Sequence, residues 1–286
     1  MTGHYPNNRL AMLADYNAVE AYILDNWCEA HRLSKLEPGV LPRLLTPGIA
    51  AAHILNTFGM VPGRRRLVFL GVEEAETIDL GFWLAELIPY LLGVEREPDK
   101  TPQITLVAPT LKPGQTGTVD FRAPGYTYSS EPFQGTVQYF ASDSGVLDEI
   151  GLAIVFQPGF EEYWQTWLMD AGEAFLSIVE HGAPIVLGGY DKAETELDWG
   201  ILSAYGFAPT TPQKNPFTAL VSIPDAPMAN YFCHSFFALT PSADHRLRTP
   251  PPADVSALIE AYHQQIEYLV RERLLDRVRS NQGGNH

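Results

Sequence analysis

Carboxylates follow three apolar runs of the sequence, at the points where buried strands are expected to end. The acidic residues in these places, together with one aromatic neighbour, are Glu73, Glu74, Glu76, Glu161, Glu162, Tyr163, Asp191 and Glu194. Because the carboxyl ends of parallel strands meet at one edge of a sheet, we expect these side chains to form an acidic rim. Such a rim could bind a divalent ion, place a carboxylate for acid-base chemistry or receive a basic protein. Acids at helix N-termini also act simply as capping residues, so a purely structural role stays open.

Two further chemical features favour packing over catalysis. Cys233 and His234 are an adjacent nucleophile and base, but neighbours on a strand point to opposite faces and cannot pair with each other. His53 lies on the apolar face of an expected helix, where a packed core histidine is the better interpretation. Cys28 and Cys233 are the only cysteines, too few for a zinc framework, and we expect reduced thiols. The sequence therefore predicts no metal site and assigns no catalytic residue.

The first acidic turn belongs to a strand, loop and helix expected within residues 67–92. Residues 67–70 are continuously apolar, as in a strand covered on both faces of a parallel sheet, and Gly71 marks the end of the run. In α/β proteins such a turn commonly holds a cofactor, and glycines there let backbone N–H groups approach the ligand. This turn carries Val72 and three glutamates instead. The sequence therefore predicts no cofactor.

Apolar runs and helical patterns continue to alternate along the chain. Further strands are expected at residues 104–108, 118–122, 136–140, 152–156 and 184–187, with an antiparallel hairpin at 218–223 and 231–239. Strands joined by helices through short links form parallel crossovers. We therefore predict a Rossmann-like α/β fold: a mostly parallel sheet with helices on both faces, antiparallel strands closing the sheet, and extra N- and C-terminal helices.

The element pattern predicts effectively one domain with additions at both ends. Residues 1–60 form an N-terminal helical segment packed on the core, and residues 61–245 form the α/β domain. The segment 114–134 is rich in Gly, Pro, Thr, Ser and Tyr, which is typical of a surface excursion. Residues 253–279 form an amphipathic C-terminal helix, either docked on the sheet or paired with a second copy of the chain.

Composition limits the partners of this 286-residue chain. Its hydrophobic content of 45% allows a large core, and its formal net charge of −15 disfavours nucleic acid and anionic membrane surfaces as partners. The arginines at 64–66 precede a strand and are expected to form a solvated edge. No apolar run approaches the roughly 18 residues of a membrane-spanning helix, and the N-terminus has no signal-peptide pattern. We expect a cytoplasmic protein.

Five stretches, taken in order, resemble the C-terminal domain of the mitochondrial splicing suppressor proteins. They are LVFLGVEEAE, QITLVAPTL, LAIVFQPGFEEYWQTW, PIVLGGYDKAETELDWGILSAYGF and KNPFTAL, within residues 64–239. The most specific parts are residues 157–160 after a strand, residues 190–198 and residues 215–217. Eukaryotic members of that family carry an N-terminal MYND zinc finger, which this chain lacks, so zinc binding does not carry over. The resemblance implies a Rossmann-like sheet without an assigned catalytic site.

The sequence favours a non-catalytic protein-interaction module that binds a basic protein through the acidic rim, with an immunity-type role toward a basic toxin as one form of it. The alternative is a divergent S-adenosylmethionine-dependent methyltransferase, suggested by the sheet order and the closing antiparallel strands, with Glu73 or Glu74 near the cofactor. The missing glycine-rich turn argues against that enzyme. A metal-dependent hydrolase at the rim comes third, because it lacks nearby histidine ligands. The C-terminal helix adds the prediction of a homodimer.

Overall fold

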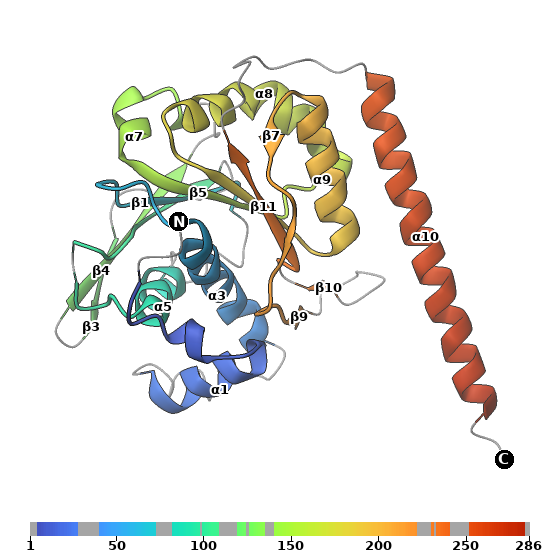
Figure 1. Cartoon of the computed structure of the whole chain (residues 1–286), viewed down its shortest axis with the longest axis horizontal. Coiled ribbons are helices and arrows are strands. Elements are labelled where there is room, and N and C mark those ends of the chain that lie inside the picture. Colours follow the sequence, from blue (N-terminus) through green and yellow to red (C-terminus); the bar gives the residue numbers. More distant parts are fainter. Residues whose placement is uncertain are drawn as a thin grey trace.

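A central sheet with helices on both of its faces forms the body of the protein (Figure 1). The computed structural model describes residues 5–27, 40–72, 82–97, 99–108, 119–123, 126–134, 140–221, 230–231, 233–240 and 252–283. The predicted fold class is confirmed, since the sheet is mostly parallel and is flanked by helices.

The strands are joined in an order that differs from their order in the chain. They are β1 (Arg66–Leu70), β2 (Gln103–Ala108), β3 (Val119–Ala123), β4 (Tyr126–Gln134), β5 (Ile150–Phe156), β6 (Ile185–Gly189), β7 (Ala208–Pro209), β8 (Gln213–Lys214) and β11 (Ser235–Thr240). Their order across the sheet is β3-β4-β2-β1-β5-β6-β11-β7, and β8 also pairs with β11. A separate ribbon pairs β9 (Leu220–Val221) with β10 (Asn230–Tyr231).

Strand direction divides the sheet into a parallel centre and antiparallel margins. β4, β2, β1, β5 and β6 are mutually parallel. β11 runs antiparallel to β6 on one side and to β7 and β8 on the other, so β7 and β8 point the same way as β6. At the opposite margin β3 is antiparallel to β4. A single reversed strand is therefore inserted between strands that run with the centre of the sheet.

Two hydrophobic cores lie on the two faces of the sheet. Leu67 and Phe69 of β1 join the core formed with α1 (Tyr16–Asn26), α3 (Val40–Phe58) and α5 (Phe82–Leu92). Val68 and Leu70 join the other core, with α7 (Ser144–Glu149), α8 (Phe160–Glu180) and α9 (Lys192–Ala204). Alternate side chains of a strand point to opposite faces, so a strand covered on both faces must be apolar throughout. This explains the continuous apolar run of β1.

The N-terminal segment packs on the first of these cores. A short 3-10 helix, η1 (Arg9–Met12), precedes α1, and Leu10, Val19 and Ile23 are buried. α3 begins at Val40, so Pro47 lies inside the helix. Proline removes one backbone N–H from a helix, and apolar packing of the flanking turns outweighs that loss here.

His53 of α3 is half-buried and packs its ring against core aromatic residues. Its ring centroid lies 5.1 Å from that of Phe217 and 5.6 Å from that of Phe236, in edge-to-face geometry. Burial lowers its pKa to about 4, so the ring is neutral at physiological pH.

Two strand predictions differ from the structure. The strand beside β2 is β4 at residues 126–134, inside the segment that the composition marked as a surface excursion, while the strand predicted at 136–140 falls mostly outside the described residues. The predicted closing hairpin is also wrong, because β9 pairs with β10 in the separate ribbon and the sheet is closed by β11 with β7 and β8. Both differences depend on tertiary pairing partners, which local patterns do not specify.

The last helix, α10 (Pro252–Gly283), packs by its first turns and then extends away from the sheet (Figure 1). Val255 is buried, and Leu258, Ile259 and Tyr262 are partly buried against the core of α8 and α9. The helix therefore docks mainly on α9. Within the described ranges no helix combines the length and the apolar character needed to cross a membrane.

Candidate functional site

The candidate site lies where the sheet order changes direction, between β1 and β5. From β1 the chain moves outward through β2 to β4, and it then returns to the other side of β1 to form β5 and β6. Open α/β sheets bind ligands in the crevice outside the carboxyl ends of the strands at such a switch point. The residues that follow β1 and β5 therefore come first in the search for a site.

Left-handed backbone marks both sides of the switch point. Gly71, directly after β1, has φ 70°, and its N–H donates to the Val107 carbonyl of β2 at 2.8 Å. After β5, Gln157 has φ 49° and Gly159 has φ 62°. Glycine adopts this conformation freely, but a glutamine held there is strained by about 1–3 kcal/mol. Strain of this kind clusters at functional sites, which directs attention to Gln157.

Gln157 combines this backbone strain with an unused donor. Its backbone N–H donates to the Gly188 carbonyl at 2.7 Å, which fixes the residue over the end of β6. Its side-chain nitrogen Nε2 is buried and has no hydrogen-bond partner among the described residues. A buried donor without an acceptor costs about 1–3 kcal/mol. The amide is therefore placed where a ligand oxygen or nitrogen could accept its hydrogen bond.

Two of the predicted rim residues form a helix cap after β6. The Asp191 carboxylate accepts a hydrogen bond from the Glu194 backbone N–H at 2.9 Å, and the Glu194 carboxylate accepts one from the Tyr190 backbone N–H. This reciprocal arrangement satisfies exposed donors at the start of α9. Glu194 is 7% exposed, and burial raises its pKa to about 8. Glu194 is therefore not part of an exposed acidic rim.

Asp198 lies one turn further along α9 and was not singled out by the sequence. Both of its carboxylate oxygens are buried, with no hydrogen-bond partner in the described part of the chain. Burial, and next the neighbouring Glu194, hold its pKa well above its ordinary value. Burial thus favours the protonated form of the Asp198 carboxyl. The available signal was the spacing of four residues from Glu194, which places both acids on the buried face of the helix.

The acids after β5 lie at the start of α8, partly beneath α10. Glu161 and Glu162 occupy the first turn of α8, and Glu162 is exposed. The Glu161 oxygen Oε2 lies 3.9 Å from His263 Nε2 of α10. Burial, followed by Glu161, raises the pKa of Tyr262 in the same helix. Glu161 thus faces α10, whereas the side chain of Tyr163 lies outside the described residues.

The acidic rim is therefore brought together only in part. Glu161 and Asp191 both raise the pKa of Glu194, so the turns after β5 and β6 do lie close together. Glu73, Glu74 and Glu76 lie outside the described residues. Where side chains are described, no group of three or more His, Cys, Asp or Glu residues is arranged to hold a metal ion.

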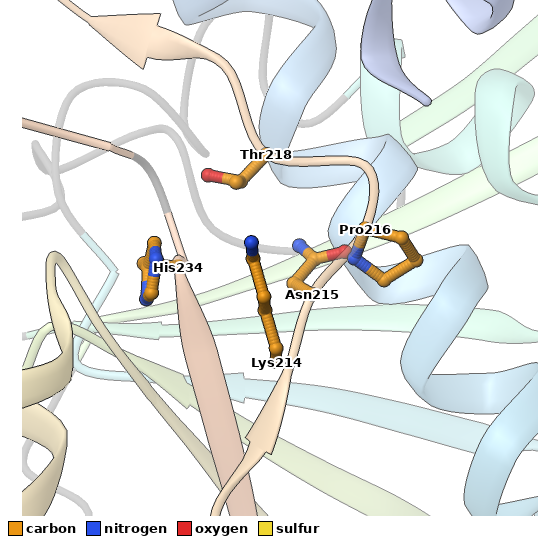
Figure 2. A pocket seen from close by; sticks show the side chains of 5 residues that line it. All are labelled: Lys214, Asn215, Pro216, Thr218 and His234. Atoms are coloured by element: carbon orange, nitrogen blue, oxygen red, sulfur yellow. The ribbon is translucent and has the colours of Figure 1, made fainter. Parts of the chain in front are cut away.

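A pocket of about 570 Å³ opens beyond β6, at the same edge of the sheet. It is lined by Lys214, Asn215, Pro216, Thr218 and His234 (Figure 2). The sequence had noted residues 215–217 only for their resemblance to a family and His234 only as a neighbour of Cys233. No local pattern joins the two segments, because β8 and β11 meet through antiparallel pairing.

Cys233 and His234 do not act as a nucleophile and base pair. Cys233 is fully buried, and a Cβ atom added at Gly188 would lie 2.6 Å from its Sγ, so the thiol packs against β6. Burial raises the pKa of this thiol. His234 Nδ1 instead lies 2.9 Å from the Ser235 hydroxyl oxygen. The thiol is a packing group, and the imidazole lines the pocket.

Comparisons with known proteins give information on the fold alone. No protein-family model and no curated protein sequence matches the chain, so the resemblance to the splicing suppressor family stays a prediction. One similar structure is a putative methyltransferase from Thermoplasma acidophilum, with 15% identity over 65% of this chain and 71% of the other, at a TM-score of 0.36. Another is an S-adenosylmethionine-dependent O-methyltransferase from Thermotoga maritima, with 8% identity over 74% and 70% of the two chains, at a TM-score of 0.38.

These findings correct the leading functional hypothesis. The non-catalytic interaction module required an exposed acidic rim, but Glu194 is buried and Asp191 is bonded within the helix cap. The two structures named above are described as methyltransferases, the class that the sequence placed second. The interaction module, with its immunity-type role, was therefore the wrong choice. A basic protein partner stays a prediction that the described residues do not test.

Proposed function

We propose that this protein is a divergent S-adenosylmethionine-dependent methyltransferase whose ligand lies at the carboxyl ends of β1 and β5. The observation that carries the proposal is the reversed strand β11, inserted between β6 and the strands β7 and β8 that run with it. This sheet order, with antiparallel strands that close the sheet, is the feature that suggested a methyltransferase from the sequence. Two features of the switch point support this ligand position: the left-handed backbone at Gly71 and Gln157, and the side-chain amide of Gln157, whose Nε2 has no described partner.

The residues that flank the switch point fit a ligand of this kind. S-adenosylmethionine carries hydrogen-bond acceptors on its base, ribose and carboxylate groups, and Gln157 Nε2 is a buried donor without a described partner. Gly71 lets the chain turn away from the sheet directly after β1. When bound, the donor supplies a methyl group activated for transfer to a nucleophile. The chain's contribution is to bind and orient, with Gln157 as the residue we assign to binding.

Calorimetry and thermal unfolding with S-adenosylmethionine and its demethylated product test this proposal. A ligand at 100 times its dissociation constant stabilises the folded state by about 2.7 kcal/mol, which gives a clear rise in melting temperature. We expect binding of at least one of the two compounds. In Gln157→Leu, which keeps the side-chain size but removes the donor, the affinity should fall about tenfold.

Gln165→Leu is the matched control, because Gln165 is an exposed residue of α8. Its affinity should equal that of the unchanged protein. The absence of heat and of any thermal shift with either compound would overturn the proposal, and equal affinities in all three proteins would remove Gln157 from the site.

A further inference from the structure

The pocket beyond β6 carries cationic and neutral polar groups in a strongly acidic protein. The chain has a formal net charge of −15, yet the described lining contains a lysine, a histidine, a threonine and an asparagine and no acid. Figure 2 shows the Lys214 side chain between His234 and Asn215, with its ammonium directed toward the side of the pocket where Thr218 lies. A basic concavity of this kind selects for a negatively charged ligand.

Lys214 is available to such a ligand. Lys214 takes no part in the ion pairs that Arg9, Arg66, Lys100, Lys192 and His263 form in the described part of the chain. The lysine is the second residue of the short strand β8, and its backbone pairs with Ser235 of β11. Its position at the mouth of the pocket is therefore set by the sheet.

Asn215 makes the wall of the pocket rigid. This residue is fully buried, and its backbone N–H donates to the His234 carbonyl at 2.8 Å. Its side-chain Nδ2 donates to the Cys233 carbonyl at 2.9 Å, and its Oδ1 accepts from the Phe217 N–H at 3.0 Å. The hydrogen bonds of Asn215 thus join the end of β8 to the start of β11. It holds Lys214 and His234 on opposite sides of one preformed space.

The pocket is next to the switch-point site. The His234 N–H donates to the Gly189 carbonyl at 2.9 Å, and the Gln157 N–H donates to the Gly188 carbonyl at 2.7 Å. Gln157 and His234 therefore flank the end of β6 from its two sides. Two strand spacings separate them, or about 10 Å. A small molecule spans that distance, so one substrate could reach both places.

We propose that this pocket binds the oxyanion end, a carboxylate or a phosphate, of the small molecule on which the protein acts. Lys214 supplies the charge, and His234 and Thr218 supply hydrogen-bonding groups at the sides of the pocket. The assignment to a substrate rests on the proposed methyltransferase function, whereas binding of the oxyanion does not.

The charges around His234 agree with this assignment. Burial and then Lys214 lower the pKa of His234, while Asp191 at the start of α9 raises it. An anion between Lys214 and His234 would offset the repulsion between the two groups. Its binding should therefore raise the pKa of His234 and take up protons when measured below neutral pH.

The test is a titration of the full chain with inorganic phosphate and, separately, with acetate, without any methyl donor. The readouts are the heat of binding and the NMR titration of the His234 imidazole. We expect saturable binding of at least one anion, together with a raised His234 pKa. Tighter binding of phosphate identifies the ligand group as a phosphate, and tighter binding of acetate identifies it as a carboxylate.

Lys214→Gln removes the charge and keeps most of the side-chain length, so anion affinity should fall about tenfold. Lys100→Gln is the control, since it removes one exposed positive charge that pairs with Glu97 elsewhere on the protein. Failure of both anions to bind saturably, or equal affinity in Lys214→Gln and the unchanged protein, would overturn the proposal. Binding of S-adenosylmethionine is measured independently, so the two proposals can fail separately.

Discussion

At the scale of single residues, Gln157 is held in a conformation and an environment that disfavour it. The left-handed φ of 49° strains the backbone, and the buried Nε2 atom is without a described partner. Replacement by glycine relieves both features, because glycine adopts positive φ freely and carries no amide. A residue that destabilises its own fold at a switch point is expected to be retained for a ligand.

We predict that Gln157→Gly raises the free energy of unfolding by about 1 kcal/mol while weakening the binding of S-adenosylmethionine. The measurements are urea denaturation without ligand and calorimetry with it. Gln157→Asn is the comparison, since asparagine tolerates left-handed backbone and keeps an amide. A loss of stability in Gln157→Gly would show that the side chain has a structural role in the free protein.

Asp198 gives a prediction on pH. Its pKa is raised in the folded state above its ordinary value of 3.8, so the folded protein binds a proton that the unfolded chain releases. The associated stability is present in full below pH 3.8 and is lost as the pH rises toward the folded pKa. Within that interval, the free energy of unfolding falls by up to about 1.4 kcal/mol for each pH unit.

Asp198→Asn carries no proton to lose at this position, so its stability should depend less on pH. We expect urea denaturation to give similar free energies for the variant and the unchanged protein near pH 4, and a more stable variant at pH 8. Glu194 contributes in the same direction through its own raised pKa, so part of the slope should remain. Parallel profiles for the two proteins would mean that Asp198 is ionised in the fold.

At the scale of elements, the sequence identified the strands and helices that have a clear apolar pattern of their own. The continuous apolar run of β1 predicted a strand covered on both faces, and the helical repeats predicted α8 and α9. β4 was missed, because its polar and aromatic residues resemble a loop until β2 pairs with them. The pairing partner of β11 was wrong for the same reason. Long-range pairing has no local signal.

The candidate site was harder to predict than the elements. The sequence pointed to the carboxyl ends of the strands, where Gln157 lies, but it chose carboxylates, of which Asp191 caps a helix and Glu194 is buried. Gln157 precedes Pro158, and a residue before proline ordinarily prefers extended backbone. The local sequence therefore did not predict the left-handed conformation of Gln157. The pocket required β8 and β11 to meet, which only the tertiary structure shows.

Asn215 links two elements, and its loss should be costly. We predict that Asn215→Ala lowers the free energy of unfolding by about 2–4 kcal/mol, because the Cys233 carbonyl and the Phe217 N–H lose their buried partner. Urea denaturation measures the change. Asp143→Ala serves as the comparison, since its side chain caps the short helix α7 at an exposed position, where the expected loss is about 1 kcal/mol. Equal losses in the two variants would contradict the linking role of Asn215.

At the scale of the whole molecule, the dominant feature is a long helix that leaves the body of the protein. The first turns of α10 pack beside α9, and the helix then projects outward (Figure 1). Tyr268 is 62% exposed and Leu269 is 41% exposed on this projecting part. Exposed large apolar side chains on a projecting helix are typical of surfaces that bind a partner. The sequence-based prediction of a homodimer through this helix stays a prediction, and the structure indicates which residues would test it.

We predict that the protein is a dimer at micromolar concentration and that the double variant Tyr268→Glu and Leu269→Glu is a monomer. Charges placed on both apolar positions would have to be desolvated between paired helices, which opposes association. Sedimentation equilibrium gives the mass directly, and circular dichroism checks that the helix persists. Met12→Glu is the control, because Met12 is an equally apolar residue that is 72% exposed on a different part of the surface. A monomeric unchanged protein, or a dimer that survives the double substitution, would exclude pairing through this part of α10.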